Sequence, residues 1–185
     1  MKEILLFFWE IVKIVLLALL IVIPIRYFIF QPFVIKGNSM EPNFHQGDYL
    51  IVDEISYRFN NPQRGDVIIF RYPRDPSQRF IKRVIGLPGE TIKIEEGKIN
   101  VINGIEKRIL DESAYELREN HTDNLTLSLK QDEYFVLGDN RVASFDSRKW
   151  GALSREYIIG KVVLRTWFPS ITSNISNPLS ILFKQ

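Results

Sequence analysis

The first 30 residues of the chain are far more apolar than the rest. Residues 4–25 are apolar except for Glu10 and Lys13, which are three positions apart and can pair on one face of a helix. A helix needs about 20 apolar residues to cross the hydrocarbon core of a bilayer. The pattern therefore predicts a transmembrane helix over about residues 4–30, within a membrane anchor formed by residues 1–32.

The sequence after this apolar segment favours an anchor that is retained. It reads RYFIFQPFVIKG and contains no A-x-A-like site of small residues at which a targeting peptide would be removed. A buried core helix and a cleaved targeting peptide are the alternatives, and length and hydropathy favour the anchor over both. Lys2 and Lys13 lie on one side of the segment and Arg26 and Lys36 on the other, so charge does not select an orientation.

Beyond Pro32 the pattern changes to short runs of β-branched and aromatic residues separated by Gly, Pro and Asn. Such runs predict an antiparallel β domain. Around Glu96 and Gly97, apolar and polar residues alternate on both sides, which predicts a β-hairpin. The expected strands cover residues 33–36, 49–55, 67–72, 79–85, 91–95, 98–102, 134–137 and 158–167.

The domain organisation follows from these patterns. We expect a mostly β domain over residues 33–169, with a variable insertion at about 105–131, where the chain is polar and weakly patterned. Residues 170–185 form a C-terminal tail. We expect no helix of useful length outside the anchor, because no period of 3.6 residues is found there.

Composition excludes several classes of function. The 24 Lys and Arg residues against 22 Asp and Glu give a net charge of +2, which does not support nucleic acid as a partner. The absence of cysteine excludes disulfides, thiolate catalysis and Cys-ligated metals. His45 and His121 are the two histidines, too few for a multi-His metal site. We therefore expect no metal and no cofactor.

Ser39 and Lys82 can form a nucleophile and base. A serine hydroxyl needs a neighbouring base, which can be a neutral lysine. On a strand, Lys82 shares a face with Phe80 and Val84, and these apolar neighbours disfavour its charged form and lower its pKa. Arg83 lies on the opposite face, and a guanidinium group cannot serve as a base because it does not lose its proton. Taken singly, Ser39 could cap a turn and Lys82 could be a solvated strand residue.

Four segments combine turn residues with reactive or charged side chains, at residues 37–42, 64–67, 80–89 and 138–151. In this order behind an apolar helix, they resemble the bacterial type I signal peptidases, also called leader peptidases. The SMEP sequence from Ser39 resembles the nucleophile box of that family, RGDVIIF from residue 64 its following strand, and KRVIGLPGE from Lys82 its lysine box. The GDNR sequence from residue 138, with its continuation to residue 151, resembles the last box.

This resemblance implies a membrane-bound serine endopeptidase with a mostly β catalytic domain on the outer face of the cytoplasmic membrane. Its partners would be the lipid bilayer and exported preproteins, whose signal peptides it would cleave after small residues, at A-x-A-like sites. Ser39 would be the nucleophile and Lys82 the general base. We expect Met40, Pro42 and Phe33 to contribute to substrate binding.

The resemblance also implies supporting residues. Ser144 would hydrogen-bond Lys82, and Asp146 and Arg148 would form an ion pair on one face of a strand. The Ser39 backbone N–H is the natural first donor to the oxyanion. Because Gly37 has no side chain where some family members have a serine, we expect a backbone group or water as the second donor.

Two other functions remain open. One is a Ser/His/Asp hydrolase that uses His45 or His121, although neither histidine lies in a matching motif. The other is an inactive, membrane-tethered binding protein of the same fold, which would be expected to lack Ser39 or Lys82. The sequence also departs from many members of the family at Val142 and Ala143, where they have Asp-Asn.

Overall fold

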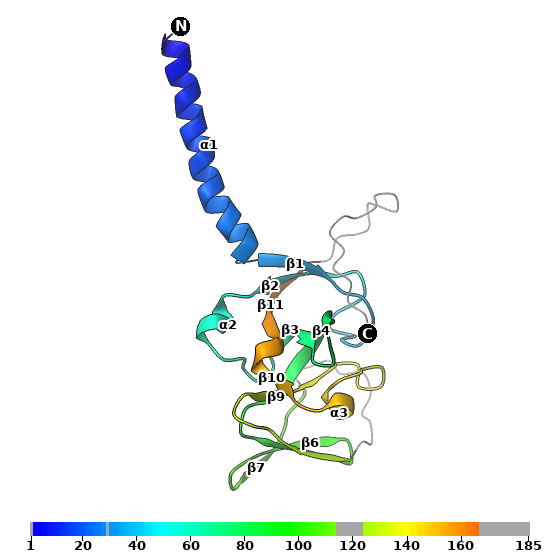
Figure 1. The fold of residues 1–185 in the computed structure, drawn as a ribbon. Coiled ribbons are helices and arrows are strands. Elements are labelled where there is room, and N and C mark those ends of the chain that lie inside the picture. The colour runs from blue at the N-terminus through cyan, green and yellow to red at the C-terminus, as the bar shows by residue number, and fades with distance from the viewer. Residues whose placement is uncertain (1, 29, 114–123, 167–185) are drawn as a thin grey trace.

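A long helix and two antiparallel β-sheets make up the described residues, 2–28, 30–113 and 124–166, of the computed structural model (Figure 1). The helix leads directly into the first strand of the larger sheet, and the smaller sheet lies at the opposite end of the molecule. The mostly β, antiparallel fold predicted from the sequence is confirmed. The predicted tail, residues 170–185, lies outside the described residues.

The N-terminal helix, α1, runs from Lys2 to Phe28. Glu10 and Lys13 form the expected ion pair at 2.7 Å, and many of the apolar side chains along the helix are exposed, among them Leu6 and Leu20. Within the described residues, no helix combines the length and the apolarity needed to cross a membrane. The transmembrane role of this segment therefore stays a prediction.

The larger sheet has the strand order β1-β2-β11-β3-β4-β9-β10. Its strands are β1 (Phe30–Val34), β2 (Tyr49–Asp53), β3 (Val67–Tyr72), β4 (Asp75–Gly86), β9 (Glu133–Leu137), β10 (Leu153–Ser154) and β11 (Ile158–Thr166). Pro32 lies in β1, at the edge of the sheet, where its missing N–H interrupts no further pairing. In the interior of the sheet, β4 pairs with β3 on one side and β9 on the other.

The smaller sheet has the order β7-β6-β5-β8 and contains β5 (Thr91–Glu95), β6 (Lys98–Asn103), β7 (Glu106–Ile109) and β8 (Leu125–Ser128). The hairpin predicted at Glu96 and Gly97 is confirmed. Both residues have positive φ angles, 49° and 74°, as a two-residue turn between twisted strands requires. The polar segment 105–131, for which no strand was predicted, supplies both edge strands of this sheet.

Two short helices and a 3₁₀ turn complete the described fold: α2 (Ser56–Phe59), α3 (Ser147–Trp150) and η1 (Arg155–Tyr157). The strand predicted to reach residue 55 ends at Asp53. The Asp53 carboxylate accepts hydrogen bonds from the backbone N–H groups of Ile55 and Ser56, which turns the chain into α2 instead of extending β2.

Apolar side chains on both faces of the larger sheet bury β4. Ile81 packs into one cluster with Phe33 and Met40, whereas Phe80 and Val84 pack into another on the opposite face. A third cluster joins the two sheets. Lys82 therefore lies in a central strand, and the residues that precede and follow it are buried.

Candidate active site

Ser39 lies in the connection between β1 and β2, residues 35–48, which we call the nucleophile turn. The turn includes Gly37, whose φ angle of 101° falls in the left-handed region that favours glycine. Asn140, from the loop after β9, fixes the turn from the other side, because its backbone N–H donates to Ser39 O at 3.0 Å and its Nδ2 to Asn38 O at 3.2 Å. The backbone around Ser39 is thus held in place, and the residue is 7% exposed.

Lys82 projects from β4 toward this turn. Its Nζ donates to Ser39 Oγ at 2.7 Å and to Ile81 O at 3.0 Å, and it lies 5.6 Å from the centre of the Phe80 ring. The amine is buried. The structure thus brings together the two residues that the sequence analysis assigned as nucleophile and base.

The surroundings of Lys82 favour its neutral form. Burial lowers the pKa of the Lys82 amine from 10.5 to about 8, because desolvation penalises the charged form. The negative charges of Asp146 and Asp139 oppose this decrease, and the positive charge of Arg148 adds to it. Desolvation is the largest of these effects, as expected for an amine between apolar strand neighbours.

Arg83 points to the other side of β4 and ties the strand to the loop after β9. Its guanidinium group donates to both carboxylate oxygens of Asp139, at 2.9 and 2.6 Å, and to Gly65 O at 2.9 Å. Asn43 Nδ2, from the nucleophile turn, donates to the same carboxylate at 2.9 Å. Asp139 therefore connects the strand that carries the lysine with the turn that carries the serine.

Asp146 and Arg148 form an ion pair, but not on a strand. Arg148 Nε lies 2.7 Å from Asp146 Oδ1, and both side chains are buried. Asp146 is the N-cap of α3 and accepts a hydrogen bond from the backbone N–H of Arg148, so the predicted strand face is wrong. Burial alone would raise the pKa of Asp146, but the hydrogen bonds and charge of Arg148 outweigh it and lower that pKa.

The Ser144 side chain does not make the hydrogen bond to Lys82 that the sequence analysis predicted. The Lys82 amine is bonded to Ser39 and Ile81 instead. The Ser144 hydroxyl lies close enough to Asp146 to help lower the pKa of that carboxyl. Among the described residues it nevertheless has no partner with full hydrogen-bond geometry. In the described structure, Ser144 therefore does not orient the Lys82 amine.

Gly138 separates Ser144 from the nucleophile turn. A Cβ atom at this position would lie 2.5 Å from Ser39 O and would also collide with the Ser144 side chain. Its backbone N–H donates to Asp146 Oδ2 at 3.1 Å. Only glycine fits at this point, so the loop after β9 can approach Ser39 closely.

The predicted substrate-binding residues lie in different surroundings. Phe33 and Met40 are fully buried and belong to the same core cluster. Pro42 is half-buried in the nucleophile turn, after a cis peptide bond. A role for these three residues in substrate binding stays a prediction.

Neither histidine takes a place beside the nucleophile in the described structure. The His45 ring is exposed and lies 3.0 Å from an Arg165 guanidinium nitrogen. No hydrogen bond joins His45 to Ser39 among the described residues. His121 lies outside the described residues.

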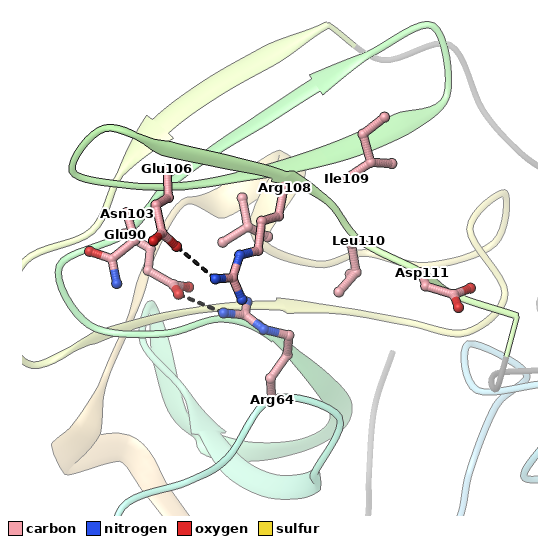
Figure 2. Close-up of a pocket in the computed structure, with 9 residues that line it drawn as sticks. Arg64, Glu90, Asn103, Glu106, Arg108, Ile109, Leu110 and Asp111 are labelled. Carbon is pink, nitrogen blue, oxygen red and sulfur yellow. Dashed lines mark hydrogen bonds and ion pairs between the residues drawn. The ribbon is translucent and has the colours of Figure 1, made fainter.

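A cavity of about 320 Å³ lies away from the serine and lysine, between the two sheets (Figure 2). Four of its charged side chains form two ion pairs: Arg64 with Glu90 at 2.5 Å, and Arg108 with Glu106 at 2.7 Å. Neither Ser39 nor Lys82 lines it. The cavity is thus separate from the candidate active site.

Sequence reasoning did not assign roles to Gly138, Asp139, Asn140 and Arg141, although it singled out their motif. Asp139 and Asn140 hydrogen-bond the nucleophile turn, and Gly138 packs closely against Ser39 O. Arg141 is buried and donates from Nε to Gly138 O at 3.0 Å. The signal available in the sequence was a run of polar residues after a strand, which is equally typical of an ordinary loop.

The chain is similar to known signal peptidases. The family described as "Signal peptidase, peptidase S26" matches residues 8–167. Probable signal peptidase I-2 of Synechocystis is 37% identical over 170 residues, which cover 85% of this chain and 72% of the relative. Signal peptidase I of Leptolyngbya laminosa is 39% identical over 163 residues, with 84% and 78% covered. Signal peptidase I V of Bacillus subtilis is 34% identical over 167 residues, with 84% and 95% covered.

A solved structure is also similar. The crystal structure of a signal peptidase I from Enterococcus faecalis is 33% identical in sequence and has a TM-score of 0.47. The match covers 56% of this chain and 98% of the other.

Proposed function

The chain belongs to the signal peptidase family, peptidase S26, a family of serine peptidases, and we propose that it removes signal peptides from exported preproteins with Ser39 as nucleophile and Lys82 as general base. The observation that carries the proposal is the distance of 2.7 Å between Lys82 Nζ and Ser39 Oγ. A serine attacks a carbonyl only when a base within hydrogen-bond reach accepts its proton.

The lowered pKa makes Lys82 a usable base near neutral pH. With a pKa of about 8, about a tenth of the Lys82 amine is neutral at pH 7, against roughly one part in three thousand at the ordinary value of 10.5. The neutral amine has a lone pair that can accept the Ser39 hydroxyl proton. No metal or cofactor is required for this chemistry.

The reaction then follows the two-step course of serine peptidases. Ser39 Oγ attacks the scissile carbonyl carbon while Lys82 Nζ takes the hydroxyl proton. The protonated amine gives this proton to the leaving nitrogen, which releases the mature protein and leaves the signal peptide esterified to Ser39. Water, activated by the neutral Lys82 amine, hydrolyses the ester and restores the serine.

The Ser39 backbone N–H is the first donor we propose for the oxyanion. Among the described residues it donates to no acceptor, so it is available to the developing negative charge. Gly37 offers no side-chain donor at its position. A backbone group or water would supply the second hydrogen bond.

The substrate class rests on the similarity to signal peptidases. We propose exported preproteins that carry small residues at an A-x-A-like cleavage site just beyond an apolar signal segment. Such a substrate is held in a membrane, so the peptidase must work close to the bilayer surface.

We further propose that α1 anchors the chain in the cytoplasmic membrane, with residues 33–185 on the outer face. In support, the described apolar side chains of α1, such as Leu6 and Leu20, are exposed, and an exposed apolar surface of this extent is unfavourable in water. Protease added to intact spheroplasts tests the orientation. If the β domain is protected until the membrane is broken, the proposed topology is wrong.

Cleavage of a reporter preprotein by the purified chain tests the proposed activity. Wild type should release the signal peptide, and Ser39→Ala and Lys82→Ala should each reduce the rate by about 10²–10⁴-fold, the usual contribution of such groups. His45→Gln, together with His121→Gln, is the control for a Ser/His hydrolase and should retain most of the activity. An inactive binding protein would instead hold the preprotein without cleaving it.

A further inference from the structure

Arginine side chains gather around a pocket at the side of the larger sheet. The pocket has a volume of about 230 Å³ and lies between α2, the end of β3 and the start of β11. It is distinct from the serine and lysine site. Its lining residues are Glu54, Tyr57, Arg58, Arg71, Arg155, Ile158 and Ile159.

Positive charge exceeds negative charge in this pocket. Arg58 and Arg71 are exposed, and among the described residues neither forms an ion pair. Arg155 donates to Tyr57 O and stacks over the Tyr57 ring, so its guanidinium group is fixed without a carboxylate. Glu54 is the one acidic residue among those that line the pocket.

A fourth arginine, Arg79, adds to the excess of positive charge near the pocket. Arg79, on β4, is the direct cross-strand partner of Arg71 on β3. Like charges at such positions are destabilising. The Arg79 Nη1 atom is buried and has no hydrogen-bond partner among the described residues, and its positive charge acts on Glu54 together with those of Arg58 and Arg71. A bound anion would offset this repulsion.

The pocket lies near the point where α1 joins the β domain. In the register of β1 and β2, Phe30 is opposite Asp53, so Glu54 is within roughly 16 Å of the last residue of α1. α2 contacts β11, and Figure 1 shows it nearer than β7 to the end of α1 that joins β1. Phe59, next to Arg58, has an exposed fraction of 82%. An exposed ring beside basic residues is typical of a membrane interface.

We propose that the pocket between Arg58, Arg71 and Arg155 binds the phosphate group of anionic phospholipids at the membrane surface from which α1 emerges. Guanidinium groups suit phosphate because they donate paired, charge-assisted hydrogen bonds. Lipid bound here holds the β domain in one orientation against the bilayer. This inference rests on the membrane anchoring proposed above, but not on the catalytic roles of Ser39 and Lys82.

Short-chain lipids test the proposal on the full chain in nonionic detergent. The chain contains no cysteine, so Asn61→Cys gives a single site for an environment-sensitive fluorophore near the pocket. We would titrate this protein with dihexanoyl phosphatidylglycerol, dihexanoyl phosphatidylcholine and inorganic phosphate. Arg58→Gln with Arg71→Gln removes two pocket charges. The matched control, Lys98→Gln with Lys107→Gln, removes two charges from the smaller sheet.

We expect phosphatidylglycerol to bind saturably and more tightly than the other two probes. The arginine variant should raise its Kd about 30-fold, since a basic residue at an anionic surface contributes about 1 kcal/mol and 1.4 kcal/mol is tenfold. The lysine control should change the Kd less than twofold. The proposal would be overturned if both variants lost affinity for phosphatidylglycerol equally, or if the arginine variant lost none. Tighter binding of inorganic phosphate than of lipid would also overturn it.

Preprotein cleavage in the same detergent separates this proposal from the proposed activity. If wild type cleaves the reporter and Ser39→Ala does not, while phosphatidylglycerol fails to bind, the lipid site alone is wrong. If lipid binds with the expected dependence on the arginines but no cleavage occurs, the peptidase assignment fails and the lipid site stands.

Discussion

Glu112 and Arg141 join the segment after β7 to the loop after β9. The Glu112 carboxylate accepts hydrogen bonds from both terminal nitrogens of the Arg141 guanidinium group, and both side chains are mostly buried. Arg141 in turn holds Gly138 O, and its own carbonyl accepts from Arg148 Nη2 at 2.7 Å. A residue of the polar insertion thus supports the loop that packs against Ser39.

Replacing Glu112 by Gln should therefore weaken the active site from a distance. The variant leaves a buried guanidinium group without its counter-charge, which costs about 1–3 kcal/mol of stability for an unsatisfied buried group. We expect a lower free energy of unfolding in detergent and a slower cleavage rate. Glu106→Gln, in the exposed pair with Arg108, is the matched control and should change stability by less than about 0.5 kcal/mol. Equal effects of the two variants would contradict the supporting role of Glu112.

Gly138→Ala should disturb the nucleophile turn directly. The added Cβ would lie 2.5 Å from Ser39 O, and a displacement of about 1 Å at a reacting group can cost 10²-fold in rate. We expect kcat/KM for a reporter preprotein to fall by about that factor. Gly104→Ala, where a Cβ would meet no atom within 4 Å, is the control for a Gly→Ala change away from Ser39 and should retain turnover. Full activity in a folded Gly138→Ala protein would rule out the close packing at Ser39.

The buried amine of Lys82 should lower the stability of the fold below pH 10. Its pKa is about 8 in the folded chain and near 10.5 when unfolded, so between these values the unfolded state binds more protons and the free energy of unfolding rises with pH. At pH 7, Lys82→Met should therefore stabilise the chain by about 1–3 kcal/mol, and the gain should vanish above about pH 10.5.

Denaturation of the two proteins in detergent at pH 7 and pH 11 checks this expectation. Lys98→Met, at an exposed position, should differ little from wild type at either pH. A Lys82→Met protein that is less stable than wild type at pH 7 would mean that the amine does not bear a desolvation cost.

Apolar residues, in a continuous run in β3 and in alternation in β5, made several strands predictable. The strands β3 and β5 have the expected bounds because each places apolar side chains against a core, as in Ile92 and Ile94. β7 was missed because all four of its side chains are exposed, so burial imposes no alternation on its sequence. β8 was also missed, although Leu125 and Leu127 alternate with polar residues and pack against the core, because two apolar residues in a polar segment are too few to identify a strand.

The site was only partly predictable. The apolar neighbours of Lys82 in the strand indicated a lowered pKa, and the structure bears out that direction. The helix at Asp146 was missed because it has four residues, too few for a period of 3.6 to be visible. The position of Ser144 depends on how closely Gly138 approaches Ser39, and no local pattern encodes a contact between distant loops.

The proposed role of Lys82 as a base is tested most directly by the activity of Lys82→Arg. Arginine keeps the positive charge and much of the length, but it cannot lose its proton, so it can replace a charge and not a base. We would measure kcat/KM for a reporter preprotein from pH 6 to pH 10 with wild type, Lys82→Arg and Lys82→Ala, after checking that each is folded. Wild-type activity should rise through an ionisation near pH 8, where Lys82 becomes neutral. Both variants should be reduced by about 10²–10⁴-fold above that pH, and the difference from wild type should narrow toward pH 6. Substantial cleavage by a folded Lys82→Arg protein would contradict the assignment of Lys82 as the general base.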